Sequence, residues 1–330
     1  MKEIGIIILN WNGANDTIEC LESLDASSIY DIYLVDNGSA DDSKESIIKY
    51  IEGSKYQSKS KVYTRDEFVK PTEGLSFITL DENLGFAGAN NYICNIIKDD
   101  YKYVMLLNND TYVVEDVIEK MRDILEKKDY AAITCDIRRY SDHKELWNAG
   151  GNFTWYGDRL YFSQKVIDAK IAQGVECIDA DFITGCAPII KGDYIRKYGL
   201  FTDRFFHGEE DFNFCKNVKK NGYKCGVYLQ GVIYHKVGSS IKGTVNKERE
   251  RNSHILHYSN RIIDFKLFYG KVRWTLWREM YLFLIFLLRL RSGYNLREAC
   301  ILIKYIRTIT NKYDRVDKRL FDKIMSLKYQ

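Results

Sequence analysis

The chain has 330 residues, of which 45% are hydrophobic and 29% charged, and its formal net charge at pH 7 is +3. This composition is that of a globular protein that can bury one large core or two smaller ones. The eight cysteines form no Cys-x-x-Cys pair and no zinc-finger spacing, which excludes those metal sites and predicts buried, reduced thiols.

Over the first 130 residues, short apolar runs alternate with helical patterns. Strands are predicted at Ile4–Leu9, Ile32–Val35, Leu75–Leu80 and Tyr103–Leu107. Helices are predicted between and after them, over Asp16–Leu24, from Ser39 or Asp41 to Ile51, over Phe86–Lys98 and over Val114–Lys127. The stretch from Gly53 to Gly74 is rich in Lys and Ser and is predicted to be an extended surface loop or a hairpin. The alternation is typical of βαβ units on a largely parallel sheet.

From residue 130 to 240 the signals are mixed and rich in strands, with candidates at Ala131–Thr134, Phe153–Phe162 and Val227–Tyr234. We expect this half to cover an active-site face.

No basic-then-apolar leader occupies the first thirty residues, so a cytoplasmic protein is expected. The longest apolar stretch, Met280–Leu288, is shorter than the ~20 residues that span a bilayer, so we expect no crossing.

Beyond Lys247 the pattern is helical throughout, and aromatic residues alternate with Arg and Lys. Residues 241–330 contain 20 Lys and Arg residues against 8 Asp and Glu residues. Such a composition is typical of helices in a membrane interface. Packing against the chain's own domain, or against a sister subunit in a homodimer, is the alternative. Nucleic acid is disfavoured as a partner because no recognised binding motif accompanies the basic residues.

Polar residues follow the first two predicted strands: Asn10 and Asn12 after the first, and Asp36 and Asn37 after the second. Open α/β sheets bind their ligands at this edge. A carboxylate such as Asp36 can accept the imide N–H of uracil or thymine, so a pyrimidine nucleotide is favoured. An Asx turn before a helix is the alternative interpretation of Asp36.

The segment Asn83–Asn91 leads into a helix with small residues, so its free N–H groups would approach a substrate closely. The segment does not match the Gly-x-Gly-x-x-Gly fingerprint, which disfavours a nicotinamide or flavin dinucleotide as the ligand. The chain also has no Gly-x-x-x-x-Gly-Lys-Ser/Thr phosphate-binding loop, which disfavours ATP hydrolysis. Asn108, Asn109 and Asp110 follow the strand Tyr103–Leu107 and offer oxygen ligands to a hard divalent cation. A polar turn that caps the next helix is the alternative.

Three consecutive carboxylates, Glu209, Glu210 and Asp211, precede a predicted amphipathic helix. Acidic residues are common electrostatic caps at a helix start. Three consecutive carboxylates are more than capping requires, and the pKa of one of them can be shifted so that it acts as a general base. His235 ends the last predicted strand, where it would either complete a metal shell or serve a structural role.

Together these segments resemble an inverting family 2 glycosyltransferase of the GT-A fold, in the rhamnosyltransferase-like branch, over about residues 3–240. The resemblance implies an α/β fold: a Rossmann-like, mostly parallel central sheet with helices on both faces. It implies a domain over residues 1–245, with a nucleotide-binding half at 1–130 and an acceptor-binding half at 131–245. Residues 246–330 would be a basic, aromatic-rich helical extension.

The resemblance also assigns roles to residues. The nucleotide-binding positions it implies are Asn10, Asn12, Asp36, Asn37, Asn83, Gly85, Asn90, Asn108 and Asn109. Asp110 would be the principal carboxylate for Mg²⁺ or Mn²⁺, with His235 near the metal and diphosphate. Asp211 would be the catalytic base beside Glu210. Glu209 and the loop of Gly185 and Cys186 would border the acceptor, although Asn213 and Asn217 depart from the family's Glu-Asp-x-Asp-Leu pattern and its following arginine.

The implied reaction moves a sugar from a nucleotide-sugar donor, dTDP-rhamnose or a UDP-hexose, to a hydroxyl of a surface-glycan or lipid-linked saccharide acceptor. The basic helices would then hold the protein on the inner face of the plasma membrane. Two alternatives remain open. One is a non-catalytic protein that binds nucleotide sugars or glycans, because a fold does not prove turnover. The other is a sugar-nucleotide pyrophosphorylase, which would need a glycine-rich loop with Arg and Lys where Asn10-Trp11-Asn12-Gly13 stands.

Overall fold

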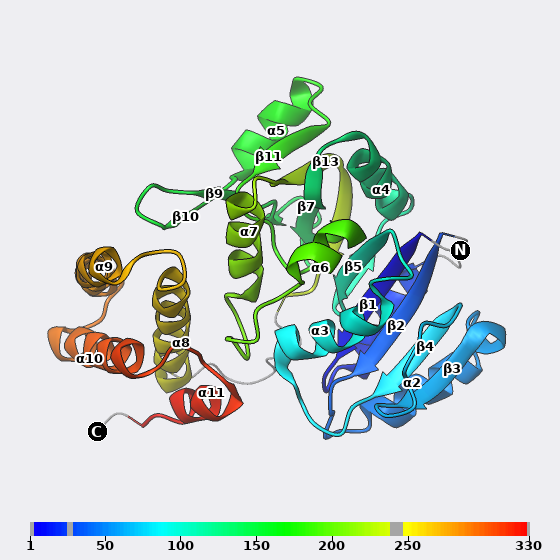
Figure 1. The fold of residues 1–330 in the computed structure, drawn as a ribbon, viewed down its shortest axis with the longest axis horizontal. Helices are drawn as coiled ribbons and strands as arrows, with labels where there is room; N and C mark the ends of the chain where they lie inside the picture. Colours follow the sequence, from blue (N-terminus) through cyan, green and yellow to red (C-terminus); the bar gives the residue numbers. More distant parts are fainter. Residues whose placement is uncertain (1–2, 25–28, 238–246, 329–330) are drawn as a thin grey trace. The chain divides into compact units, whose positions relative to one another are not determined.

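The computed structural model describes residues 3–24, 29–237 and 247–328 (Figure 1). The chain divides into two compact units. The larger unit comprises Met1–Phe201 with Phe214–Lys242, and the smaller comprises Thr202–Asn213 with Gly243–Gln330. A single break near residue 245 was the expectation. The short segment that carries the three carboxylates thus groups with the C-terminal helices.

A mixed sheet forms the centre of the larger unit. In spatial order its strands are β11 (Cys177–Ala180), β13 (Lys224–His235), β7 (Tyr130–Arg139), β12 (Ile189–Lys191), β5 (Tyr103–Asn108), β1 (Ile4–Asn10), β2 (Tyr30–Asp36), β4 (Leu75–Thr79) and β3 (Ser60–Thr64). Every pair from β5 to β3 is parallel, whereas β12 is antiparallel to both of its neighbours. Two short strands pair at the side, β6 (Thr111–Val113) with β13 and β8 (Leu146–Asn148) with β7. The predicted α/β class with a mostly parallel sheet is confirmed.

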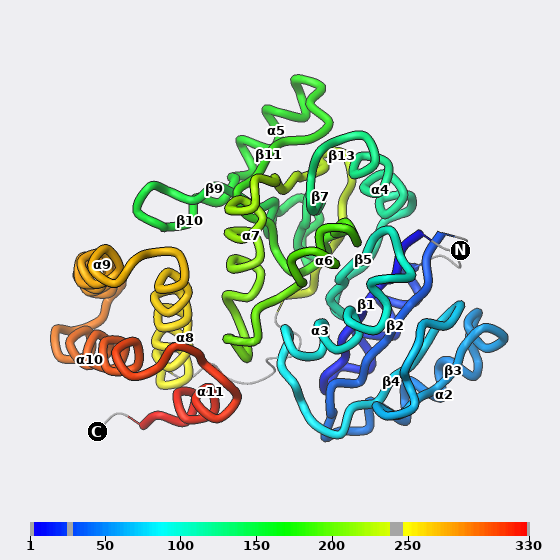
Figure 2. Tube along the Cα trace, in the orientation of Figure 1, coloured from blue at the N-terminus to red at the C-terminus, as the bar shows by residue number. Residues whose placement is uncertain are grey.

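Helices connect these strands. They are α1 (Ala14–Ser23), α2 (Ser43–Glu52), the 3₁₀ turn η1 (Gln57–Lys59), α3 (Gly85–Ile97), α4 (Val117–Lys127), α5 (Gln164–Ala172) and α6 (Gly192–Tyr198). The apolar strand residues and the inner faces of α1, α2 and α4 share one core, in which Ile6, Leu34 and Met105 are fully buried. Figure 2 follows the alternation of strand and helix through the first 130 residues. This order brings the ends of β1, β2 and β5 to one edge of the sheet.

Three sequence predictions in the larger unit need correction. The stretch from Gly53 to Gly74 contains an edge strand, β3, parallel to β4, and no hairpin. The predicted strand Phe153–Phe162 is instead a hairpin of β9 (Gly151–Phe153) and β10 (Arg159–Tyr161), with Gly157 at φ +85° in its turn. The helix predicted from Val114 begins at Val117: Thr111–Val113 form β6 against β13, and Asp116, directly before the helix, has φ +63°.

The smaller unit is helical, as predicted. Its helices are α8 (Lys247–Phe265), α9 (Lys271–Arg291), α10 (Leu296–Lys312) and α11 (Lys318–Met325), and α7 (Glu210–Lys220) begins in this unit. Asn295 caps α10 through a capping box with Glu298, and Asp317 caps α11. The inner faces of α8, α9, α10 and α11 form a separate core around Trp277, Leu302 and Ile306. In the ranges that the structure describes, no helix combines the length and the apolar content needed to cross a membrane.

All eight cysteines are free. Six of them are buried, which confirms the expectation of buried thiols at those positions. Cys177 is half-buried, and Cys300 is exposed on α10. The expectation was therefore wrong for Cys300.

Candidate active site

Asp36 lies at the end of β2, and its carboxylate is held in one orientation by three donors. In the sheet register Asn10 of β1 lies opposite Asp36. The Asn10 Nδ2 donates to Asp36 Oδ1 at 2.8 Å, and Ser39 donates to Oδ1 through Oγ at 2.6 Å and to Oδ2 through its backbone N–H at 3.2 Å. Asn10 is fully buried and Asp36 is 3% exposed. Asn10 thus positions the carboxylate.

Asn37 ties the loop after β2 to the start of α3. Its Oδ1 accepts from the Leu84 N–H at 2.9 Å, and its Nδ2 donates to Asn83 Oδ1 at 3.1 Å. Asn83 Oδ1 also accepts from the Gly85 N–H at 2.7 Å. Gly85 has φ +76°, a conformation that favours glycine. These bonds hold two loop ends together at the edge where Asp36 lies.

Gly38 allows the close approach of these two loops. It has φ +69°, and a Cβ at this position would lie 2.5 Å from the carbonyl carbon of Glu82. A side chain here would push the loop after β4 away.

Asn12 and Asn90 both make bonds within the protein. Asn12 is exposed, its N–H donates to Ser39 Oγ at 2.9 Å, and its Oδ1 accepts from the Ala40 N–H at 2.8 Å. Asn90 is 1% exposed, and its Nδ2 donates to the Phe86 carbonyl at 2.9 Å. The Asn90 amide therefore supports the first turn of α3, and its predicted contact with a nucleotide stays a prediction.

A buried threonine joins the end of β5 to the end of β1. Asn109 Nδ2 donates to Thr17 Oγ1 at 2.9 Å, and Thr17 Oγ1 donates to Asn10 Oδ1 at 2.8 Å. Since Asn10 donates in turn to Asp36, a continuous relay runs Asn109–Thr17–Asn10–Asp36. Thr17 is fully buried, and the sequence analysis did not single it out. The only signal in the sequence was a polar residue among the apolar positions of the predicted first helix.

Asp110 follows Asn109 directly and contacts His235 at the end of β13. His235 Nε2 lies 2.9 Å from Asp110 Oδ1, and β13 is placed there by its pairing with β6, in which His235 faces Thr111. The two side chains are almost fully buried, at 6% and 5% exposure for the residues as wholes. His235 Nδ1 is buried and has no hydrogen-bond partner among the described residues, and the ring centroids of Trp147 and His235 lie 4.2 Å apart with an interplanar angle of 69°. The imidazole is thus fixed mainly by the carboxylate.

This pair fits a divalent cation only in part. Carboxylate oxygen and imidazole nitrogen are both ligands of Mn²⁺, and carboxylate oxygen suits Mg²⁺. Among the residues that the structure describes, no group of three or more His, Cys, Asp and Glu side chains is gathered to hold a metal ion. Asp110 and His235 would therefore hold a cation whose remaining ligands come from the substrate or from water.

The loop that was predicted to border the acceptor is buried. Cys186 is 2% exposed and its side chain belongs to the core of the larger unit. Its carbonyl accepts from the Asn108 N–H at 2.8 Å, and its own N–H donates to Thr184 Oγ1 at 3.2 Å. Burial raises the pKa of the Cys186 thiol well above its ordinary value. This leaves Cys186 a structural support for the end of β5, and Gly185 beside it is buried as well.

In the smaller unit, α8 shapes the turn that leads into α7. Asn260 is 1% exposed, and its Nδ2 donates to the carbonyls of His207 at 3.0 Å and Gly208 at 2.7 Å. Gly208 has φ +77°, and the next residue, Glu209, has φ +98°. A glutamate in this region is strained, and such outliers cluster at functional sites.

The three carboxylates after this turn differ in their surroundings. Glu209 and Glu210 are 3% and 6% exposed, whereas Asp211 is half-buried and its Oδ1 accepts from the Phe212 N–H at 2.8 Å. Burial, followed by the charges of Asp211 and Glu209, raises the pKa of Glu210 to about 8. Glu210 is therefore largely protonated at neutral pH. Asp211 is the most accessible of the three.

The sequence family decides the class of protein. The model of the family described as "Glycosyl transferase family 2" matches residues 5–197, which is more than half of the chain. The chain belongs to this family. The matched residues of this family 2 glycosyltransferase include Asp36, Asn109 and Asp110, but neither Asp211 nor His235.

Two solved structures are similar to this glycosyltransferase in fold. One is the mannosyltransferase PcManGT from Pyrobaculum calidifontis in complex with GDP-Man and Mn²⁺, with a TM-score of 0.53 and 14% identity over 98% of this chain and 85% of that one. The other is GalNAc-T7 with UDP, GalNAc and Mn²⁺, with a TM-score of 0.58 and 12% identity over 98% of this chain and 56% of that one. No curated protein matches the chain. The predicted GT-A fold is confirmed.

Proposed function

We propose that this glycosyltransferase is an inverting enzyme that moves a hexose from dTDP-rhamnose or a UDP-hexose to a hydroxyl of a surface-glycan or lipid-linked saccharide. The observation that carries the proposal is the buried relay from Asn109 to Asp36, which starts directly beside Asp110. The relay connects Asp36, whose carboxylate suits a pyrimidine base, with Asn109, the neighbour in sequence of Asp110, whose carboxylate suits a metal-bound diphosphate.

In the donor complex, Asp36 accepts the imide N–H of the base. Its Oδ1 already has two donors, so its Oδ2, with one, has the free lone pair for this bond. Asn10 and Ser39 keep the carboxylate oriented before the donor arrives. A fixed acceptor favours uracil and thymine over adenine, which lacks this donor.

Asp110 and His235 hold the diphosphate end of the donor. Lewis-acid stabilisation of the departing diphosphate would come from a Mg²⁺ or Mn²⁺ ion held by these two residues. His235 would offer its imidazole nitrogen to that ion, beside the Asp110 carboxylate. The Mn²⁺ in the complexes of PcManGT and GalNAc-T7 supports this assignment.

Asp211 acts as the base in a single displacement. Its carboxylate takes the proton of the acceptor hydroxyl, and the oxygen forms a bond to the anomeric carbon from the face opposite the diphosphate. The bond from that carbon to the diphosphate oxygen breaks, its electron pair leaves with the nucleoside diphosphate, and the configuration inverts. Glu210, being protonated, adds no second charge beside the base, and Glu209 borders the acceptor.

A thermal-shift screen of nucleotide sugars with and without Mn²⁺ tests the donor, because a ligand that binds only the folded protein raises its melting temperature. The best donor is then used in a transfer assay with Asp110→Ala and Asp211→Asn. We expect both variants to lose most of their turnover. Wild-type turnover in both would contradict the roles, and donor binding without product over a range of acceptors would favour a non-catalytic binding protein.

A further inference from the structure

Helix α9 carries apolar side chains on two faces. Its inner face, with Trp274, Trp277 and Ile285, packs into the core of the smaller unit. A second set is exposed to solvent: Val272 (75%), Leu276 (70%), Met280 (41%), Phe283 (60%) and Leu287 (36%). These five residues, which we call the α9 stripe, follow one another at spacings of four, four, three and four.

That spacing places the α9 stripe along one face of the helix. At 1.5 Å per residue it is about 22 Å long. Glu279, the acidic residue of α9, lies on this face between Leu276 and Phe283, and its charge is paired with Arg278 at 2.7 Å and with Arg307 of α10 at 2.6 Å. Continuous exposed apolar surface of this kind marks an interaction site.

The surroundings of the α9 stripe are strongly basic. Helices α9 and α10 together contain nine Lys and Arg residues against two acidic residues, Glu279 and Glu298. Glu298 pairs with Arg251 of α8. Lys271 and Arg273 lie exposed at the start of α9, and Arg291 is exposed at its end. The face therefore presents an apolar centre with cations at both ends.

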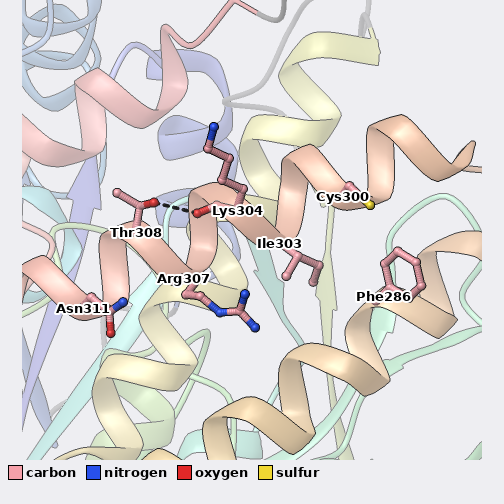
Figure 3. A pocket seen from close by; sticks show the side chains of 7 residues that line it. All are labelled: Phe286, Cys300, Ile303, Lys304, Arg307, Thr308 and Asn311. Carbon is pink, nitrogen blue, oxygen red and sulfur yellow. Dashed lines mark hydrogen bonds between the residues drawn. The ribbon is translucent and has the colours of Figure 1, made fainter.

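A cavity of about 330 Å³ lies beside the α9 stripe, between α9 and α10. It is lined by Phe286, Cys300, Ile303, Lys304, Arg307, Thr308 and Asn311. In Figure 3 the Arg307 side chain extends from α10 toward the helix that carries Phe286. Cationic groups beside apolar walls suit a phosphate joined to a hydrocarbon chain.

We propose that the α9–α10 face docks on an anionic lipid bilayer, which goes beyond the proposed glycosyl transfer. The α9 stripe lies at the boundary of headgroups and acyl chains, and the basic residues at its ends and on α10 contact lipid phosphates. A second copy of the chain is the competing occupant. A two-fold interface brings the same patch against itself, so the cations of one copy would meet those of the other. Charge complementarity therefore favours the bilayer.

The test is flotation of the full chain with vesicles of phosphatidylcholine, alone or with about one third phosphatidylglycerol. We expect wild-type protein to float with the anionic vesicles. Leu276→Glu/Phe283→Glu should weaken flotation at least about tenfold, because two apolar side chains no longer enter the bilayer. The matched control is Val69→Glu, which places a carboxylate at a 74% exposed apolar residue of the larger unit and should float like wild type.

The charge contribution is tested separately with Arg273→Glu/Arg291→Glu. Each arginine replaced should weaken binding to anionic vesicles at least about fivefold, since the glutamate also adds a negative charge, with little change for neutral ones. All the substituted side chains are exposed, and circular dichroism with thermal melting checks that the variants fold. Wild-type flotation of the stripe variant would overturn the proposal. So would a wild-type dimer that the stripe variant converts to a monomer in sedimentation without vesicles.

Discussion

Replacing Glu210 by glutamine is expected to stabilise the protein in alkaline solution and to leave its stability in acid nearly unchanged. Glu210 is 6% exposed, and its Oε2 has no hydrogen-bond partner among the described residues. Burial and the charges of Asp211 and Glu209 raise its pKa from an ordinary 4.5 to about 8. Glutamine has the size of the protonated side chain and cannot ionise.

The sign follows from the protons bound in each state. The folded protein keeps the Glu210 proton up to about pH 8, whereas the unfolded chain releases it near pH 4.5. Between these values the unfolded state binds fewer protons, so the free energy of unfolding falls as the pH rises, by up to about 1.4 kcal/mol per pH unit. The contribution that the Glu210 proton makes to the free energy of unfolding is fully present below pH 4.5 and is lost as the pH rises through about 8. Above that pH the variant should be more stable than wild type by a few kcal/mol, as an order of magnitude.

Urea unfolding at about pH 5 and about pH 9 measures this difference. The control is Glu248→Gln, which changes an exposed glutamate at the start of α8 and should follow the wild-type profile. If the Glu210→Gln variant unfolds at the wild-type midpoint in alkaline solution, Glu210 is not a buried, protonated group, and the account of the acidic cluster is wrong.

Three further substitutions test the site. Thr17→Val removes the donor to Asn10 Oδ1 and the acceptor of Asn109 Nδ2, so it should cost about 1–3 kcal/mol of stability and weaken nucleoside diphosphate binding in calorimetry. The control Thr310→Val, at another buried threonine, should not change binding, and equal affinities of the wild type and the Thr17→Val variant would refute the relay. Asp211→Asn should lower turnover by about 10²–10⁴ and keep donor affinity, and a matching loss of affinity would assign Asp211 to binding. Gly38→Ala should lower the free energy of unfolding by about 1–3 kcal/mol, since its Cβ would lie 2.5 Å from the Glu82 backbone; an unchanged urea midpoint would mean that the loop rearranges freely.

The strands β1, β2, β4 and β5 could be predicted to within a residue or two at each end, whereas β7 runs five residues past its predicted end and the short inner strand β12 was not predicted. The strands β1 and β5, expected at Ile4–Leu9 and Tyr103–Leu107, each extend one residue further. Their apolar runs are continuous because neighbouring strands and helices bury both faces. The edge strand β3 gave no such signal, since its five residues are half-buried or exposed and carry Ser, Lys and Thr beside Val and Tyr. An edge strand is specified by its neighbour, which single-sequence patterns do not contain.

The strained turn before α7 also could not be predicted. Glu209 reads in the sequence as one of three acidic residues near a helix start, and nothing local requires φ +98°. That conformation depends on Asn260, some fifty residues later, whose amide holds the carbonyls of His207 and Gly208. The raised pKa of Glu210 has the same origin, because burial by distant elements is its largest cause.

The different roles of Asn10 and Asp36, at the ends of β1 and β2, could not be predicted from the residue pattern. Asn10 and Asp36 look equivalent in the sequence, since each is a polar residue that closes an apolar strand. Parallel pairing sets them opposite one another, and the fully buried Asn10 then donates through Nδ2 to Asp36 and Ser39 and accepts from Thr17 at Oδ1. Asp36 keeps acceptor capacity at Oδ2, which has one donor. Of the two residues, Asp36 is therefore the one suited to contact a base, and Asn10 acts through it.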